Sequence, residues 1–179
     1  KPNKFPMEDH INRNKSDNKV KNLRWYNRKE NRRKCNFNRF FEINKETKYA
    51  LEYFGIEAPK FIEKIEEGQT VILVDHNEFS QSADGIENAK IDTVVDHHRI
   101  GIKTAEPLFY MAEPVGCTST ILYSIYKMNN IEITPAMAGL MLSAIISDTL
   151  LLKSPTTTKK DIKAVEELAK IANVDYNTY

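Results

Sequence analysis

The chain has 179 residues, 41% hydrophobic and 28% charged, which is typical of one globular domain or slightly more. It contains no run of about 18 apolar residues and no apolar segment at its start, so we expect neither a transmembrane helix nor a secretory signal peptide. Its two cysteines cannot make a disulfide framework, and we therefore expect a cytoplasmic protein.

The net charge of +1 hides a division of the chain near residue 42. Residues 1–42 carry 13 Lys and Arg against 5 Asp and Glu, whereas the remaining residues carry 13 against 20. The first segment also contains nine Asn, no Gly and no Ala, and its apolar residues follow no sustained period. It could be a disordered basic arm, an arm that binds nucleic acid, or a stretch read in a shifted reading frame. No nucleic-acid-binding motif accompanies it, so we do not expect a nucleic-acid partner.

From residue 43 onward the hydrophobic pattern predicts alternating helices and strands. Continuous β-branched runs predict two strands that are buried on both faces, and helical spacing between glycines, capping residues and prolines predicts the helices. The predicted strands are 70–74 and 91–95, and the predicted helices are 46–54, 59–67, 82–89, 118–127, 136–146 and 158–172. Strands separated by helices predict an α/β fold with a parallel sheet flanked by helices.

Polar side chains of the kind that bind metals follow both predicted strands. Residues 75–78 read Asp-His-Asn-Glu and residues 96–99 read Asp-His-His-Arg, and a further acid, Asp148, follows the most apolar predicted helix. A single Asp after a strand is usually a cap or a turn residue. Two such clusters would face the same crevice at the carboxyl edge of a parallel sheet. Carboxylate oxygen and imidazole nitrogen suit Mn²⁺, Zn²⁺ or Fe²⁺, so the pattern favours a metal site.

Two other segments allow two interpretations each. Residues 113–120 precede a helix and could receive an anion or simply cap that helix. Cys117, within this segment, is expected to be a packed residue rather than a nucleophile, because no base lies near it in the sequence. Residues 153–156 (Lys-Ser-Pro-Thr) could contact phosphate or form a turn.

Several of these segments together resemble one family. Residues 96–98 (Asp-His-His) after a strand are similar to the signature of the DHH phosphoesterases, whose N-terminal domain is Rossmann-like. Residues 74–78, 95–99 and 147–156 resemble the manganese-dependent (family II) inorganic pyrophosphatases. Residues 53–55 (Tyr-Phe-Gly) and 113–116 (Glu-Pro-Val-Gly) fit the same group. The similarity runs from about Glu42, so residues 43–179 are expected to form an incomplete DHH-type α/β domain and residues 1–42 a separate, atypical basic segment.

The resemblance implies a reaction and a set of residue roles. The reaction is hydrolysis of inorganic diphosphate to two phosphates by a metal-bound hydroxide. Asp75 would be shared between two metal ions, and His97 and Asp148 would complete the shell of one of them. His98 would be a catalytic residue that also binds the substrate, and Asp96 would orient His97. The implied metal is Mn²⁺, with Co²⁺ or Mg²⁺ as alternatives and two or more ions in the intact enzyme, and the implied assembly is a homodimer.

Two features depart from the family pattern. The family begins with a strand and a His-x-x-x-Asp-x-Asp motif, whereas counting from His10 this sequence has Asn14 and Ser16. The family also has a second domain that supplies cationic side chains, and this chain ends where the linker to it would begin. We therefore expect a fragment of low or no activity, with a frame shift ending near Phe41. A DHH-family phosphodiesterase acting on short oligonucleotides or nucleotides, or a non-catalytic degenerate domain, are the alternatives.

Overall fold

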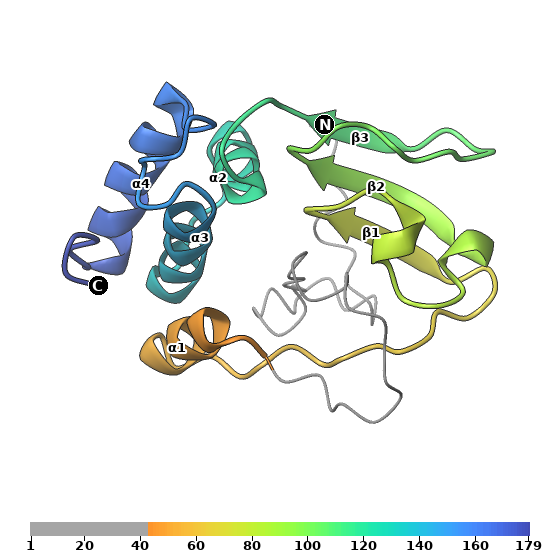
Figure 1. Cartoon of the computed structure of the whole chain (residues 1–179), viewed down its shortest axis with the longest axis horizontal. Coiled ribbons are helices and arrows are strands. Elements are labelled where there is room, and N and C mark those ends of the chain that lie inside the picture. The colour runs from red at the N-terminus through yellow and green to blue at the C-terminus, as the bar shows by residue number, and fades with distance from the viewer. Residues whose placement is uncertain (1–42) are drawn as a thin grey trace.

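A computed structural model describes residues 43–179 of the chain (Figure 1). The basic segment of residues 1–42 lies outside the described residues, and so do the expectations that concern it. The described part begins with helix α1, continues with a sheet and ends with three helices. These elements are α1 (Lys45–Tyr53), β1 (Thr70–Val74), β2 (Lys90–Asp96), β3 (Phe109–Ala112), α2 (Thr118–Met128), α3 (Pro135–Asp148) and α4 (Lys159–Ala172).

The three strands form a parallel sheet in the order β1-β2-β3. Val71 pairs with Ile91 and Val74 with Val95, and the register shifts by one residue between them. Val71, Leu73, Ile91 and Val94 are buried in one cluster, as expected for β-branched and aliphatic runs in a covered parallel sheet. All three strands point toward the helical part of the molecule (Figure 1). Their carboxyl ends therefore face the helices.

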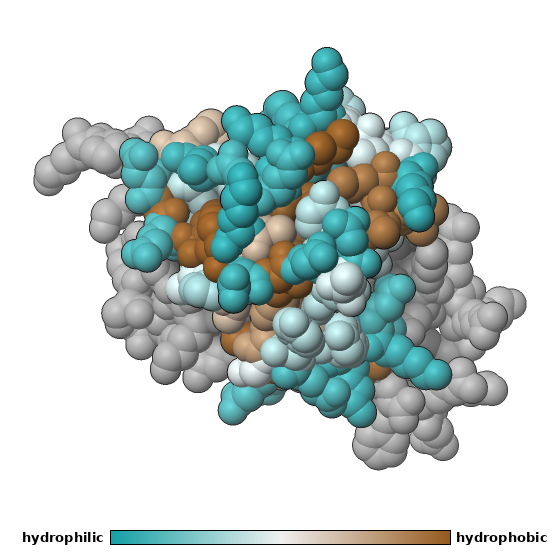
Figure 2. Space-filling model, turned by 90° about the vertical axis from the view of Figure 1, so that its left-hand side faces the viewer, coloured by the Kyte–Doolittle hydropathy of each residue, from teal (hydrophilic) through white to brown (hydrophobic). Residues whose placement is uncertain are grey.

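The helices that follow the sheet pack mainly against one another. Helices α2, α3 and α4 bury a shared core that includes Tyr123, Leu142, Ile145 and Leu168. The side chain of Thr134 accepts a hydrogen bond from the Met137 N–H at the start of α3, as is typical of a threonine at the N-cap. The molecular face on the α4 side is largely hydrophilic, with hydrophobic side chains visible between the polar ones (Figure 2).

Two predicted elements are wrong and one strand was not predicted. Residues 59–67 are not helical, because Ile65 N–H and Asp84 N–H donate to the carbonyls of Asp84 and Glu63 in an extended pairing. Within 82–89 only a 3₁₀ turn, Ile86–Asn88, is helical. Strand β3 reads Phe-Tyr-Met-Ala; its two aromatic residues favour a strand, but it is four residues long and lacks the β-branched run that predicts β1 and β2.

Across residues 43–179, none of the helices has the length and hydropathy needed to span a bilayer.

Candidate metal centre

Asp75 lies directly after β1, at the carboxyl edge of the sheet. Its N–H still donates to the carbonyl of Val95 at 3.0 Å, but its φ of +66° is left-handed, a conformation that is uncommon for residues other than glycine and clusters at functional sites. The Thr118 hydroxyl donates to Asp75 Oδ1 at 2.8 Å. Burial raises the pKa of the Asp75 carboxyl to about 6, with a further contribution from Asp148, and the Thr118 bond and both nearby histidines oppose this shift.

His97 and His98 follow the last residue of β2 and meet Asp75. His97 Nε2 lies 3.6 Å from Asp75 Oδ1, and the two imidazole rings are 4.1 Å apart between centroids. One ligand-type atom from each of Asp75, His97 and His98 lies within 4.8 Å of the others. Within residues 43–179, these three side chains form a cluster that could hold a metal ion.

The expectation that Asp96 orients His97 is wrong. Asp96, which is fully buried, accepts hydrogen bonds from both the N–H and the Nδ1 of His98, at 3.1 and 2.7 Å. An aspartate readily bonds to the backbone two residues further on, and this local turn brings His98 rather than His97 to its carboxylate. Burial would raise the pKa of Asp96, but the hydrogen bonds from His98 and Asn77 outweigh it and lower that pKa. His97 is instead oriented by the carbonyl of Val115, 2.9 Å from its Nδ1.

Asp148 is the last residue of α3 and approaches the same site from the helical side. Its charge contributes to the raised pKa of Asp75 and to that of the Cys117 thiol, so its carboxylate lies within electrostatic range of both groups. Burial, and then the charge of Asp148, raise the pKa of this thiol well above its ordinary value. Cys117 is therefore a packed, unreactive residue, as the sequence predicts.

Asn77 joins the two polar clusters instead of binding a ligand. Its side-chain amide donates to Asp96 Oδ2 at 2.6 Å and to the Arg99 carbonyl at 3.0 Å. Its carbonyl oxygen accepts the N–H groups of Gly101 and Ile102. A buried amide with all of these bonds satisfied is a structural cross-link between the segments that follow β1 and β2.

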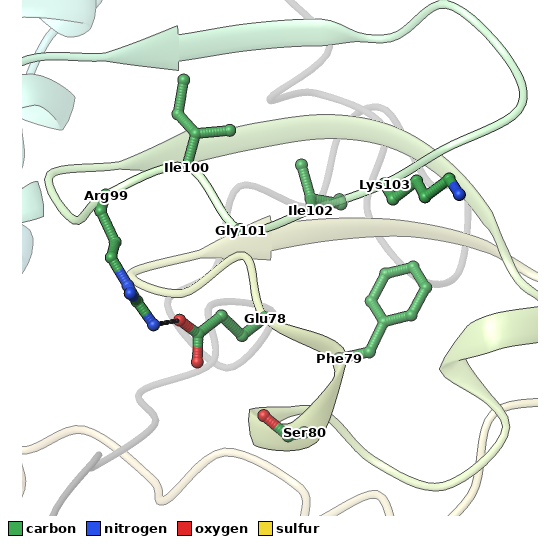
Figure 3. A pocket seen from close by; sticks show the side chains of 8 residues that line it. All are labelled: Glu78, Phe79, Ser80, Arg99, Ile100, Gly101, Ile102 and Lys103. Atoms are coloured by element: carbon green, nitrogen blue, oxygen red, sulfur yellow. Dashed lines mark hydrogen bonds and ion pairs between the residues drawn. The ribbon is translucent and has the colours of Figure 1, made fainter.

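A hollow of about 460 Å³ is present in the segments that follow β1 and β2 (Figure 3). It lies between residues 78–80 and 99–103, and its cationic side chains are Arg99 and Lys103. Arg99 donates to Glu78 Oε1 at 2.9 Å, as the dashed line in Figure 3 shows.

The other two segments with open interpretations, residues 113–120 and 153–156, contain a helix cap and a turn respectively. The side chain of Cys117 accepts the Ser119 N–H as the N-cap of α2. Residues 153–156 form a turn in which the Ser154 and Thr156 hydroxyls are hydrogen-bonded at 2.7 Å. This turn follows three successive left-handed residues, Leu150, Leu151 and Leu152.

A divalent cation fits the donor set of the site. The carbonyl of Val115 can only accept, so His97 Nδ1 must carry the proton and the lone pair of Nε2 is directed to the Asp75 side. A metal-binding histidine almost always donates its second ring nitrogen in this way. A half-buried carboxylate with a raised pKa beside two imidazoles is also a place where a cation would be stabilised.

Comparison with known proteins agrees with this geometry. Residues 10–145 match the model of the DHH family, N-terminal domain, a range that starts well before Glu42. An Exiguobacterium protein is 62% identical over 143 residues, and one from Oceanobacillus iheyensis is 58% identical over 142 residues. Both are assigned as manganese-dependent inorganic pyrophosphatases, and each alignment covers 79% of this chain and 46% of the relative. A crystal structure from Methanococcus jannaschii, assigned to the family II inorganic pyrophosphatases, superposes with a TM-score of 0.71 at 45% identity, covering 75% of this chain and 46% of that one.

The chain therefore belongs to the DHH family, through that family's N-terminal domain. Within the family, its sequence and fold resemble those of the manganese-dependent, family II inorganic pyrophosphatases, which confirms the resemblance and the α/β fold predicted from the motifs. The chain spans about half the length of the curated relatives it matches, 46% in each of these cases.

Proposed function

We propose that this domain serves the hydrolysis of inorganic diphosphate to two phosphates, with Mn²⁺ as the metal and Co²⁺ or Mg²⁺ as alternatives. The observation that carries the proposal is the convergence of Asp75, His97 and His98 within 4.8 Å at the carboxyl edge of a parallel sheet. The 62% identity to a relative assigned as a manganese-dependent inorganic pyrophosphatase supports the choice of metal and substrate.

In this proposal the metal ligands are Asp75, His97 and Asp148, with Asp75 shared between two ions. Bound divalent ions lower the pKa of water and neutralise the oxygens of a leaving phosphate. The protein contributes the orientation of the ligands, since Val115 fixes the tautomer of His97 and Thr118 holds one oxygen of Asp75. His98 contacts the diphosphate, and Asp96 holds the His98 ring in place through its hydrogen bond.

The assembly, the location and the domain organisation are also proposed from the resemblance. We propose a homodimer in the cytoplasm, with diphosphate as the partner molecule, and a division of the chain into residues 1–42 and an incomplete DHH-type domain at 43–179. The reading-frame interpretation of residues 1–42 can be tested on the coding DNA. Translation of the upstream bases in the other two frames should show a β-branched strand followed by His-x-x-x-Asp-x-Asp. If neither frame shows it, the reading-frame interpretation is wrong and residues 1–42 belong to the encoded protein, consistent with a family match that starts at residue 10.

A chimera tests the function directly. Residues 43–179 would replace the corresponding segment of the Exiguobacterium relative, which is 62% identical, so that the remaining parts of a full-length protein are supplied. We expect phosphate release from diphosphate that requires Mn²⁺ and stops on chelation. A chimera that is folded but cleaves only short oligonucleotides would favour the phosphodiesterase alternative. A folded chimera that cleaves neither substrate would favour a non-catalytic domain.

A further inference from the structure

One short segment contacts two of the proposed metal ligands. The segment is residues 115–118 (Val-Gly-Cys-Thr), between β3 and the first turn of α2. Its contacts are the Val115 carbonyl with His97 Nδ1 at 2.9 Å and the Thr118 hydroxyl with Asp75 Oδ1 at 2.8 Å. These two ligands follow β2 and β1 respectively. A single segment thus contacts side chains from the ends of two neighbouring strands.

The segment is held in place from behind by a buried carboxylate. Asp161, which has no exposed surface, accepts the Gly116 N–H at 2.9 Å and the Thr120 hydroxyl at 2.6 Å. The same carboxylate caps the N-terminus of α4 through Thr158. Gly116 is needed for this approach, because a Cβ there would come within 2.6 Å of the Thr149 methyl group. The segment is therefore fixed to α4 on one side while it contacts the metal ligands on the other.

We propose that Thr118 is a positioning residue for metal binding, which holds Asp75 in the rotamer that receives the ion. Thr118 is 2% exposed, and it lies on the first turn of α2 immediately after the N-cap. A buried hydroxyl on a capped helix has few alternative positions, so its hydrogen bond fixes the carboxylate of Asp75. The left-handed backbone of Asp75, with φ of +66°, makes such outside support more important, because the local backbone conformation is not a favoured one. This inference rests on the proposed metal site.

The test is direct metal binding by the 179-residue chain, without an activity assay. Thr118→Val keeps the shape of the side chain but removes the hydroxyl, and Thr118→Ser keeps the hydroxyl. The control is Thr93→Val, an equally buried threonine of β2 whose hydroxyl bonds to Asp92 instead of a proposed ligand. Titration would follow the electron paramagnetic resonance signal of unbound Mn²⁺, and Co²⁺ absorption spectra would report the coordination geometry.

We expect Thr118→Val to weaken Mn²⁺ binding by about tenfold and to change the Co²⁺ spectrum, since loss of a group that supports a metal ligand typically costs tenfold to a hundredfold. Thr118→Ser should restore most of the affinity, and Thr93→Val should leave it unchanged. If Thr118→Val does not fold without metal, as judged by thermal unfolding, Thr118→Ala takes its place.

Three results would overturn the inference. One is unchanged affinity and spectrum on removal of the hydroxyl. Another is a loss that Thr118→Ser does not restore, because the hydroxyl would then not be the cause. The third is the absence of Mn²⁺ binding in the unsubstituted chain, which would overturn the proposed metal site as well and is thereby distinguished from the other two.

Discussion

The two adjacent histidines of the site have different hydrogen-bond partners, and this difference predicts different roles. His97 donates to a backbone carbonyl and directs Nε2 to Asp75, as a metal ligand would, whereas His98 is bonded to the buried Asp96. In the chimera described above, His97→Ala should reduce Mn²⁺ affinity by about tenfold or more. His98→Ala should retain most of the affinity but lower the turnover number. Parallel Mn²⁺ titrations and rates of phosphate release measure the two effects, and equal losses of affinity would contradict the assignment.

Asp161 gives a prediction on stability and its pH dependence. Burial would raise the pKa of this carboxyl, but hydrogen bonds from Thr120, Thr158 and the Gly116 N–H outweigh burial and lower it. Because the folded-state pKa lies below the ordinary value of 3.8, this stabilisation is complete above pH 3.8 and is lost as the pH falls toward the folded-state pKa. Asp161→Asn should lower the free energy of unfolding at pH 7 by roughly 3 kcal/mol, the scale of a buried charged hydrogen-bond acceptor.

Urea unfolding of Asp161→Asn and the unsubstituted chain between pH 2.5 and 7 checks this prediction. The difference between them should be constant above about pH 4 and shrink below it. Asp175→Asn is the control, because the Asp175 carboxyl also accepts hydrogen bonds but is exposed, and it should change stability little. A difference that stays constant down to the lowest pH would show that Asp161 acts through packing and not through its charge.

At the scale of elements, the contact between α1 and α3 depends on the absence of a side chain at Gly139. A Cβ at this position would overlap the ring of Phe54, the residue that follows α1. Gly139→Ala should therefore destabilise the chain by about 1–3 kcal/mol, the usual cost of overpacking. In a Phe54→Ala background the same substitution should stabilise it by up to about 1 kcal/mol, since alanine is the better helix former. Thermal unfolding of the four variants measures the cycle, and the same sign in both backgrounds would contradict the contact.

Elements whose local signals agree with their tertiary contacts could be predicted, and the others could not. The β-branched runs of β1 and β2 and the capping residues of α3 and α4 specify their elements locally. Residues 59–67 have helical spacing and a terminal glycine, yet Ile65 is buried in the sheet cluster through its pairing with Asp84. That pairing links positions nineteen residues apart, and no local pattern encodes it. Strand β3 depends in the same way on β2, its partner in the sheet.

The site, too, could be predicted only in part from the sequence. The residues that meet at the sheet edge, Asp75, His97 and His98, could be predicted because the carboxyl ends of parallel strands share one edge. The hydrogen-bond partners of His97 and His98 could not be predicted, because the turn after β2 determines which of the two histidines reaches Asp96. The hydrogen bond from Thr118 to Asp75 could not be predicted either. Hydroxyl residues at a helix start are visible in the sequence, but the acid that receives the hydroxyl is 43 residues away.

In the whole molecule, the site lies where two bodies meet, namely the sheet and the bundle of α2, α3 and α4. The sheet, with its own buried cluster, contributes Asp75 and the histidines, and the bundle of α2, α3 and α4 contributes Asp148 and Thr118. A smaller buried cluster of Val95, Val115, Ile121 and Ile125 joins residues of the sheet to residues of α2. A change in the docking of these bodies would thus change the spacing of the proposed ligands, which is why we expect metal binding and folding of this domain to be coupled.

The last prediction concerns the activity of these 179 residues by themselves. An in-line displacement on diphosphate needs two firmly held ions, and in residues 43–179 one cluster of three ligand-type side chains is present together with Asp148. The transferring phosphate also needs cationic side chains, and in that part of the chain Arg99 is already paired with Glu78, while Lys103 lines the hollow. We therefore expect measurable Mn²⁺ binding but little phosphate release, far below that of the chimera. The measurement is phosphate release from diphosphate with excess Mn²⁺, with His98→Ala as the matched control. A robust rate that disappears in His98→Ala would contradict the prediction and would show that residues 1–42 supply further metal ligands.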